Sequence, residues 1–144
     1  MAATECTPAD EAVFAAGSRD SRIVAAVPMA GTLSTDWFTP DAYASVDIPI
    51  MTLTGTDDPI NQQAQWDRIS GIDYTWIDIV GACHQAFALG GCGELRDADA
   101  DLIINSYTLT FGRRWVLGDM REETTNVLSG RTQVSLAALF LKKN

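Results

Sequence analysis

The sequence predicts an α/β fold in which a parallel sheet of about three strands is flanked by helices. Three apolar runs, at residues 22–30, 48–54 and 74–80, have the continuous hydrophobicity of strands that are covered on both faces. Helical patterns lie between and after these runs, and such alternation is typical of right-handed βαβ units. The chain has 144 residues, 47% of them hydrophobic, so we expect residues 1–144 to form one domain.

A short helix is predicted at residues 8–17, before the first strand. Pro8 suits the first turn of a helix, acidic residues follow it, and Gly17 can end it. The first strand, RIVAAVPMA at residues 22–30, is almost wholly apolar. A long connection rich in Thr, Asp and Pro separates it from the next strand.

Two further strands enclose a second helix. The run IPIMTLT at residues 48–54 is ended by the turn sequence GTDDP. Residues 60–69 carry apolar side chains on one face of a predicted helix, and the run YTWIDIV at residues 74–80 predicts the third strand. A loop rich in glycine follows to about residue 96.

The C-terminal third is predicted to be helical. A long helix is expected over residues 97–118, because acids occupy its first turns and two arginines lie near its end, as the helix dipole favours. Apolar residues recur every four positions and predict its buried stripe. They are Ile103, Tyr107, Phe111 and Trp115. Shorter helices are expected at residues 119–128 and 132–142, with a stop signal at Ser129-Gly130.

Composition excludes several classes of protein. Acidic residues number 19 against 10 basic ones, giving a formal net charge of −9, so nucleic acids and anionic membranes are not expected as partners. No apolar run is long enough to predict a membrane span. The first residues carry acids where a signal peptide has basic residues, so the chain as written is expected in the cytoplasm, and its source compartment is left open.

The cysteines leave two interpretations open. Cys6, Cys83 and Cys92 form no CxxC pair, and the chain has one histidine, so a structural zinc site is not expected. The esterase hypothesis given below likewise implies no metal or organic cofactor. Cys83 and Cys92 can pair across a short loop. Alternatively, they are small buried hydrophobic residues.

Polar residues follow two of the predicted strands at their carboxyl ends. Asp57 and Asp58 come after the strand at 48–54, and His84 comes after the next strand. Ligand and catalytic sites gather at this edge of a parallel sheet, so we expect Asp58 and His84 to meet there. A carboxylate beside a histidine is the orienting pair of a catalytic triad. The alternatives are an aspartate that caps the next helix and a histidine that is merely solvated.

The three strand segments together resemble a known family. RIVAAVPMA, IPIMTLTGTDDPI and YTWIDIVGACHQAFA look like the C-terminal half of an α/β-hydrolase, in the branch of dienelactone hydrolases and platelet-activating-factor-acetylhydrolase-like esterases. Gly55 to Asp58 match that family's Gly-x-x-Asp turn, and Gly81 to His84 match its Gly-x-x-His turn. The resemblance covers roughly residues 10–130. It implies an α/β-hydrolase-like fold with Asp58 as triad acid and His84 as base.

One part of the family pattern is missing. The nucleophile of these enzymes sits in G-x-S-x-G, and this sequence contains no such motif, so the expected fold is truncated ahead of its first strand. A replacement hydroxyl must lie at the same edge of the sheet, and Ser34 is the best candidate by position. Trp37 and Phe38 follow it and are candidates to line a substrate pocket. They are equally suited to a lid or to packing on a partner chain.

These observations lead to two functional hypotheses. The first is an esterase that acts on small carboxylic esters through Asp58, His84 and a hydroxyl such as Ser34 or a water molecule. The second is a non-catalytic hydrolase remnant, which serves as a binding or assembly module or takes its serine from a partner chain. The truncated sheet is also expected to expose an apolar edge near residues 22–30, which predicts a homo-oligomer through that edge.

Overall fold

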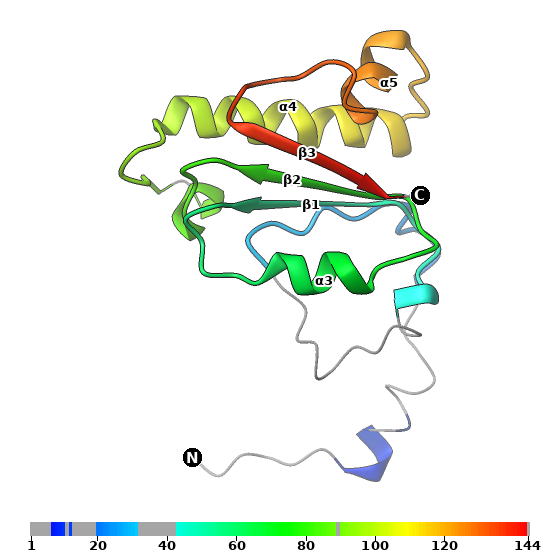
Figure 1. Cartoon of the computed structure of the whole chain (residues 1–144). Coiled ribbons are helices and arrows are strands. Elements are labelled where there is room, and N and C mark those ends of the chain that lie inside the picture. Colours follow the sequence, from blue (N-terminus) through cyan, green and yellow to red (C-terminus); the bar gives the residue numbers. More distant parts are fainter. Residues whose placement is uncertain (1–6, 11, 13–19, 32–42, 89, 144) are drawn as a thin grey trace.

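A computed structural model describes the greater part of the chain, namely residues 7–10, 12, 20–31, 43–88 and 90–143. Figure 1 shows a central sheet with helix α3 on one side and helices α4 and α5 on the other. The strands are β1 (Ile50–Gly55), β2 (Tyr74–Ile79) and β3 (Ala138–Lys143). The helices are α3 (Gln62–Arg68), the 3-10 helix η1 (His84–Ala88), α4 (Asp97–Trp115) and α5 (Glu122–Leu128).

The sheet is mixed and has the strand order β1-β2-β3. Strands β1 and β2 are parallel, in a register that pairs Ile50 with Tyr74 and Gly55 with Ile79. This pair confirms the strands predicted at 48–54 and 74–80. Strand β3 joins β2 in the antiparallel direction. The sequence predicted a parallel sheet, and this prediction is wrong for strand β3, which makes the sheet mixed.

The helix predicted at residues 132–142 is wrong, because the last part of this segment belongs to strand β3. Phe140 packs on the core shared with α4, whereas Leu141 packs on the α3 side of the sheet. Neighbouring apolar side chains thus lie on opposite faces, as in any strand. A short apolar run cannot be assigned to helix or strand by periodicity alone, and the open edge of β2 decides the outcome here.

The segment predicted as the first strand pairs with β1 but forms no continuous strand. Ala26 and Met29 make isolated parallel bridges to β1. Pro28 lies between them and has no N–H to donate, although its carbonyl accepts from the backbone of Leu53 at 3.1 Å. The regular hydrogen-bond pattern of a strand is interrupted at this proline.

The expected burial of this segment on both faces is also wrong. Val27 and Met29 are partly buried against the core, but Ile23 and Val24 are 56% and 46% exposed. The beginning of the segment is therefore open to solvent, whereas residues 25–27, 29 and 30 are partly or fully buried.

The other α-helices lie where the sequence predicted them, whereas the 3-10 helix η1 falls in the segment predicted as a loop rich in glycine. Helices α3, α4 and α5 confirm the helices expected at 60–69, 97–118 and 119–128, each with shorter bounds. Residues 8–10 and 12 are helical, and the remainder of the helix predicted at 8–17 lies outside the described residues.

The two faces of the sheet differ in chemistry. The face toward α4 and α5 is apolar, and its main side chains are Met51, Leu53, Ile77 and Ile79, packed on Ile103, Tyr107 and Phe111. The face toward α3 carries hydroxyl groups among its aromatic rings. There, Gln62 donates to the hydroxyl of Tyr74 at 2.7 Å, and that hydroxyl donates to Thr52 at 3.0 Å. Burial raises the pKa of Tyr74, and these hydrogen bonds partly offset the rise.

Candidate active site

Strands β1 and β2 end at the same edge of the sheet, and hydrogen bonds tie together the turns that follow them. The backbone N–H of Thr56 donates to the carbonyl of Ile79 at 3.1 Å. The N–H of Asp57 donates to the carbonyl of Ala82 at 3.0 Å. In return, the N–H of Gly81 donates to the side-chain oxygen of Thr56 at 2.9 Å. These three bonds fix the two turns side by side.

The glycine of each turn has a structural reason to be glycine. A Cβ atom at Gly55 would lie 2.1 Å from the carbonyl oxygen of Ala82, closer than real contacts allow. Gly81 has φ +78°, a conformation that side chains rarely adopt. The first glycine lets the turns approach, and the second reverses the chain after β2.

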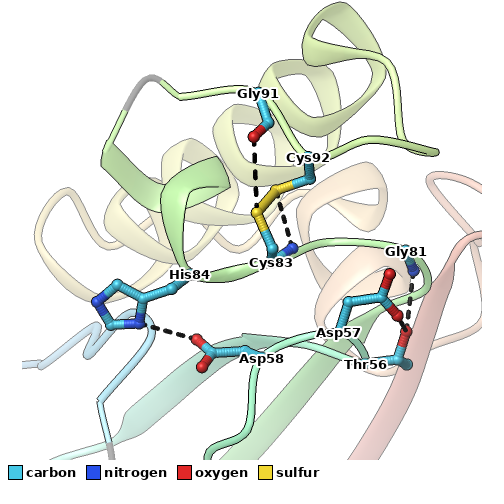
Figure 2. Close-up of a disulfide and its surroundings, with 8 residues drawn as sticks. All are labelled: Thr56, Asp57, Asp58, Gly81, Cys83, His84, Gly91 and Cys92. Atoms are coloured by element: carbon cyan, nitrogen blue, oxygen red, sulfur yellow. Dashed lines mark hydrogen bonds and ion pairs between the residues drawn. A yellow bond between two sulfur atoms is a disulfide. The ribbon is translucent and has the colours of Figure 1, made fainter.

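This close approach brings Asp58 and His84 together, as the sequence predicted. The Oδ2 atom of Asp58 lies 3.0 Å from the Nδ1 atom of His84, and Figure 2 shows the imidazole directed at the carboxylate. The Asp58 side chain is only 2% exposed, whereas that of His84 is 60% exposed. The pair therefore has a buried acid and an imidazole that solvent and ligands can reach.

The geometry determines which ring nitrogen of His84 is available for chemistry. A carboxylate accepts hydrogen bonds, so the Nδ1 atom that faces Asp58 carries the proton when the ring is neutral. The Nε2 atom then holds a free electron pair. Such a ring can accept a proton at Nε2, while the carboxylate holds its orientation and stabilises the cation that forms.

Asp57 differs from its neighbour and takes no part in this pair. Its carboxylate accepts a hydrogen bond from the hydroxyl of Thr56 at 3.2 Å, and Figure 2 shows it on the side of the turn away from His84. Neither aspartate caps helix α3, because Asn61 is the N-cap and accepts from the backbone of Ala64 at 3.2 Å. The capping interpretation of Asp58 is therefore wrong.

A disulfide joins Cys83 to Cys92 directly beside the histidine. Their Cα atoms are 5.4 Å apart, and the N–H of Cys83 donates to the sulfur of Cys92 at 2.9 Å. This settles the alternative that the sequence left open. Figure 2 shows the bridge adjoining the backbone from which His84 projects, so it ties the start of η1 to the loop before α4. The spacing of the two cysteines was the only sequence signal for it.

The positions of the three other candidate residues relative to Asp58 and His84 stay predictions. Ser34, Trp37 and Phe38 lie outside the described residues. Within the described part of the chain, no hydroxyl group is hydrogen-bonded to His84. The nucleophile and the substrate pocket therefore remain predictions from the sequence.

A hollow of about 180 Å³ borders Asp58 on the α3 side of the sheet. Its lining includes Trp76 and Asp78. Trp76 donates to the hydroxyl of Thr54 at 2.7 Å, and this hydroxyl donates to Asp78 at 2.8 Å. Trp76 is 7% exposed, and no pattern in the sequence distinguished it from an ordinary core aromatic.

Comparisons with known proteins leave the site as the main guide to function. No protein-family model matches the chain, and no curated protein matches it.

Among residues 7–10, 12, 20–31, 43–88 and 90–143, no three His, Cys, Asp or Glu side chains gather as a metal site. In the same residues, no helix combines the length and the apolar character needed to cross a membrane.

Proposed function

We propose that the protein hydrolyses small carboxylic esters, with His84 as general base and Asp58 as the residue that orients it. The observation that carries the proposal is the 3.0 Å contact between a buried carboxylate and an exposed imidazole. A solvated surface histidine needs no such partner. Holding the ring in one orientation leaves Nε2 free at an edge of the sheet where substrates bind in other α/β proteins.

The reaction needs an oxygen nucleophile whose proton His84 can remove. The hydroxyl of Ser34 or a water molecule attacks the acyl carbon of the ester, and its proton passes to Nε2. The new C–O bond forms a tetrahedral oxyanion, for which we propose backbone N–H groups of the loop after residue 30 as donors. The imidazolium then returns the proton to the departing alcohol as the original C–O ester bond breaks. Attack by water gives the carboxylic acid directly, whereas attack by Ser34 leaves an acyl-serine, which a water molecule then hydrolyses as His84 takes the proton of the water and returns it to the serine oxygen. Asp58 stays ionised throughout.

The substrate pocket is part of the same proposal. Trp37 and Phe38 follow the candidate nucleophile in the chain, and flat apolar rings suit a short acyl or alcohol group. A non-catalytic binding or assembly module is the competing function, and it keeps the fold but has no use for an oriented base.

Ester hydrolysis by four variants tests the proposal. His84→Ala removes the base and is expected to lower the rate by a factor of about 10²–10⁴. Asp58→Asn keeps the shape but not the charge and should lower it as well. Asp57→Asn is the matched control, because this neighbouring carboxylate does not touch the imidazole. Ser34→Ala separates attack by serine from attack by water.

The substrates must include an alkyl butyrate as well as a nitrophenyl ester, because an exposed imidazole hydrolyses activated esters unaided. A serine-directed fluorophosphonate that labels Ser34 alone would identify the nucleophile. Equal rates for the wild type and His84→Ala on both substrates would refute the proposed ester hydrolysis and favour the non-catalytic binding or assembly module.

A further inference from the structure

The orientation of His84 depends on how the backbone around it is held. His84 is the first residue of η1, a 3-10 helix of five residues. Before it, the carbonyl of Ala82 accepts from the N–H of Asp57 at 3.0 Å, which ties the chain to the turn after β1. Within η1, the N–H of Ala86 donates to the carbonyl of Cys83 at 3.1 Å. The position of Cys83 therefore sets the direction in which His84 leaves the backbone.

The disulfide attaches Cys83 to a partner that is itself anchored. Cys92 is 7% exposed and belongs to the apolar core that α4 shares with the sheet. Its carbonyl accepts from the N–H of Leu95 at 2.9 Å, which fixes the loop before α4. Cys83 is covalently bonded to the sulfur of Cys92, and its N–H donates to the same sulfur at 2.9 Å. Both links act on the residue directly before His84.

Cys83 and His84 project in different directions from this backbone. Figure 2 shows the side chain of Cys83 running to Cys92, whereas the imidazole of His84 points to Asp58. Neighbouring residues share a planar peptide unit, so fixing Cys83 also limits the directions open to His84. The disulfide thus holds the backbone end of the imidazole side chain, while Asp58 holds the ring.

The loop that the disulfide closes can change its shape once the disulfide is opened. The two cysteines are 9 positions apart, and Gly90 and Gly91 lie between them. Glycine has the greatest backbone freedom of all residues, and the disulfide restricts that freedom here. Ala86 is 6% exposed and packs in the core with α4, so η1 stays near its place without the disulfide. Opening the disulfide is therefore expected to loosen His84 without unfolding the domain.

We infer that the disulfide between Cys83 and Cys92 positions His84, and that its reduction by a dithiol releases the imidazole from Asp58. A thiolate of the reductant attacks one sulfur, and the second thiol of the reductant then displaces the protein and closes a disulfide in the reductant. The S–S bond of the protein breaks and each cysteine gains a proton, while the dithiol loses two electrons and two protons. Cys83 is more exposed than Cys92, so we expect the attack at its sulfur.

The effect on reaction rate rests on the proposed function, because it needs His84 to be the base of the ester hydrolysis. A displacement of about 1 Å at a catalytic site can lower a rate about 100-fold, and we expect reduction to lower the rate about 10-fold to 100-fold. Reoxidation should restore it. The protein is then active where disulfides persist and slow where thiols are kept reduced.

The ¹⁵N NMR spectrum of the single histidine tests the positioning without any substrate. At alkaline pH, we expect the ring proton on Nδ1 in the oxidised wild type and a mixture of both tautomers after reduction by dithiothreitol. The double variant Cys83→Ala/Cys92→Ala lacks the disulfide and should match the reduced wild type, with or without dithiothreitol. Cys6→Ser is the matched control, because it keeps the disulfide and should respond to dithiothreitol as the wild type does.

Hydrolysis of an alkyl butyrate and circular dichroism of the same samples complete the test. If the wild type hydrolyses no ester but its His84 tautomer changes on reduction, the proposed function fails and the positioning stands. If the tautomer is the same in the oxidised, reduced and double-variant proteins, the inference fails whatever the rate. An active wild type that keeps its rate after reduction refutes the redox control. Unfolding of both the reduced protein and the double variant also overturns the inference, because the disulfide would then hold the whole fold rather than one side chain.

Discussion

Adding one methyl group at Gly55 is expected to separate Asp58 from His84. The Cβ of Gly55→Ala would lie 2.1 Å from the carbonyl oxygen of Ala82 and 2.6 Å from its carbonyl carbon. Side-chain carbons essentially never approach other heavy atoms within 3.0 Å. Because both obstructing atoms belong to backbone, the two turns must move apart by about 0.9 Å or more.

A movement of this size exceeds what the contacts at the site tolerate. The 3.0 Å distance between Asp58 and His84 would lengthen beyond the range of a hydrogen bond. The bond from the N–H of Asp57 to the carbonyl of Ala82 would be strained in the same way. Inserting a methyl group into a packed site typically costs about 1–3 kcal/mol, and we expect Gly55→Ala to lower the free energy of unfolding by about 2 kcal/mol.

Urea unfolding, followed by tryptophan fluorescence, measures the stability change. Gly93→Ala is the matched control, because a Cβ there meets nothing within 4 Å and its φ is not positive. That variant should unfold within about 0.5 kcal/mol of the wild type. Ester hydrolysis by Gly55→Ala should fall together with its stability. If Gly55→Ala is as stable as Gly93→Ala and keeps the wild-type rate, the close approach of the turns is not what assembles the pair.

Two further predictions concern the disulfide and a buried phenol. Replacing both Cys83 and Cys92 by serine should lower the free energy of unfolding by about 2–3 kcal/mol, because the disulfide closes a short loop in the unfolded chain. Urea unfolding measures this change. Equal urea midpoints for the wild type and the double variant would contradict the prediction. Burial raises the pKa of Tyr74, so its contribution to stability is complete below pH about 10 and is lost as pH rises through the value in the folded protein. Tyr74→Phe should therefore lose less stability than the wild type between pH about 9 and about 12, and parallel curves of stability against pH would be the contrary result.

The sequence predicts the centre of this fold well because the signals there agree. The runs at 48–54 and 74–80 are apolar throughout, rich in β-branched residues and ended by glycine turns, and they form the parallel pair. Parallel strands with a helix between them end at one edge, which is why the contact between Asp58 and His84 follows from chain order alone. A residue pair of this kind depends on topology rather than on details of packing.

The peripheral elements could not be predicted with the same success. In the segment at 132–142, the local sequence suits a helix, and only the free edge of β2 makes its last residues a strand. In the segment at 22–30, apolar composition predicted full burial, but composition alone does not show which neighbours are present to cover a strand. The sequence also left the pairing of Cys83 with Cys92 open. The distance between the two cysteines depends on the conformation of η1 and of the loop that follows it.

The central claim, that Asp58 holds His84 in one orientation and tautomer, is open to a direct measurement. His84 is the single histidine of the chain, so its ring signals in a ¹⁵N NMR spectrum need no assignment. At alkaline pH, where the ring carries one proton, we predict that the proton sits on Nδ1 in the wild type and in Asp57→Asn, but not in Asp58→Asn. A wild-type ring with its proton mainly on Nε2, or one that Asp58→Asn leaves unchanged, would contradict the account.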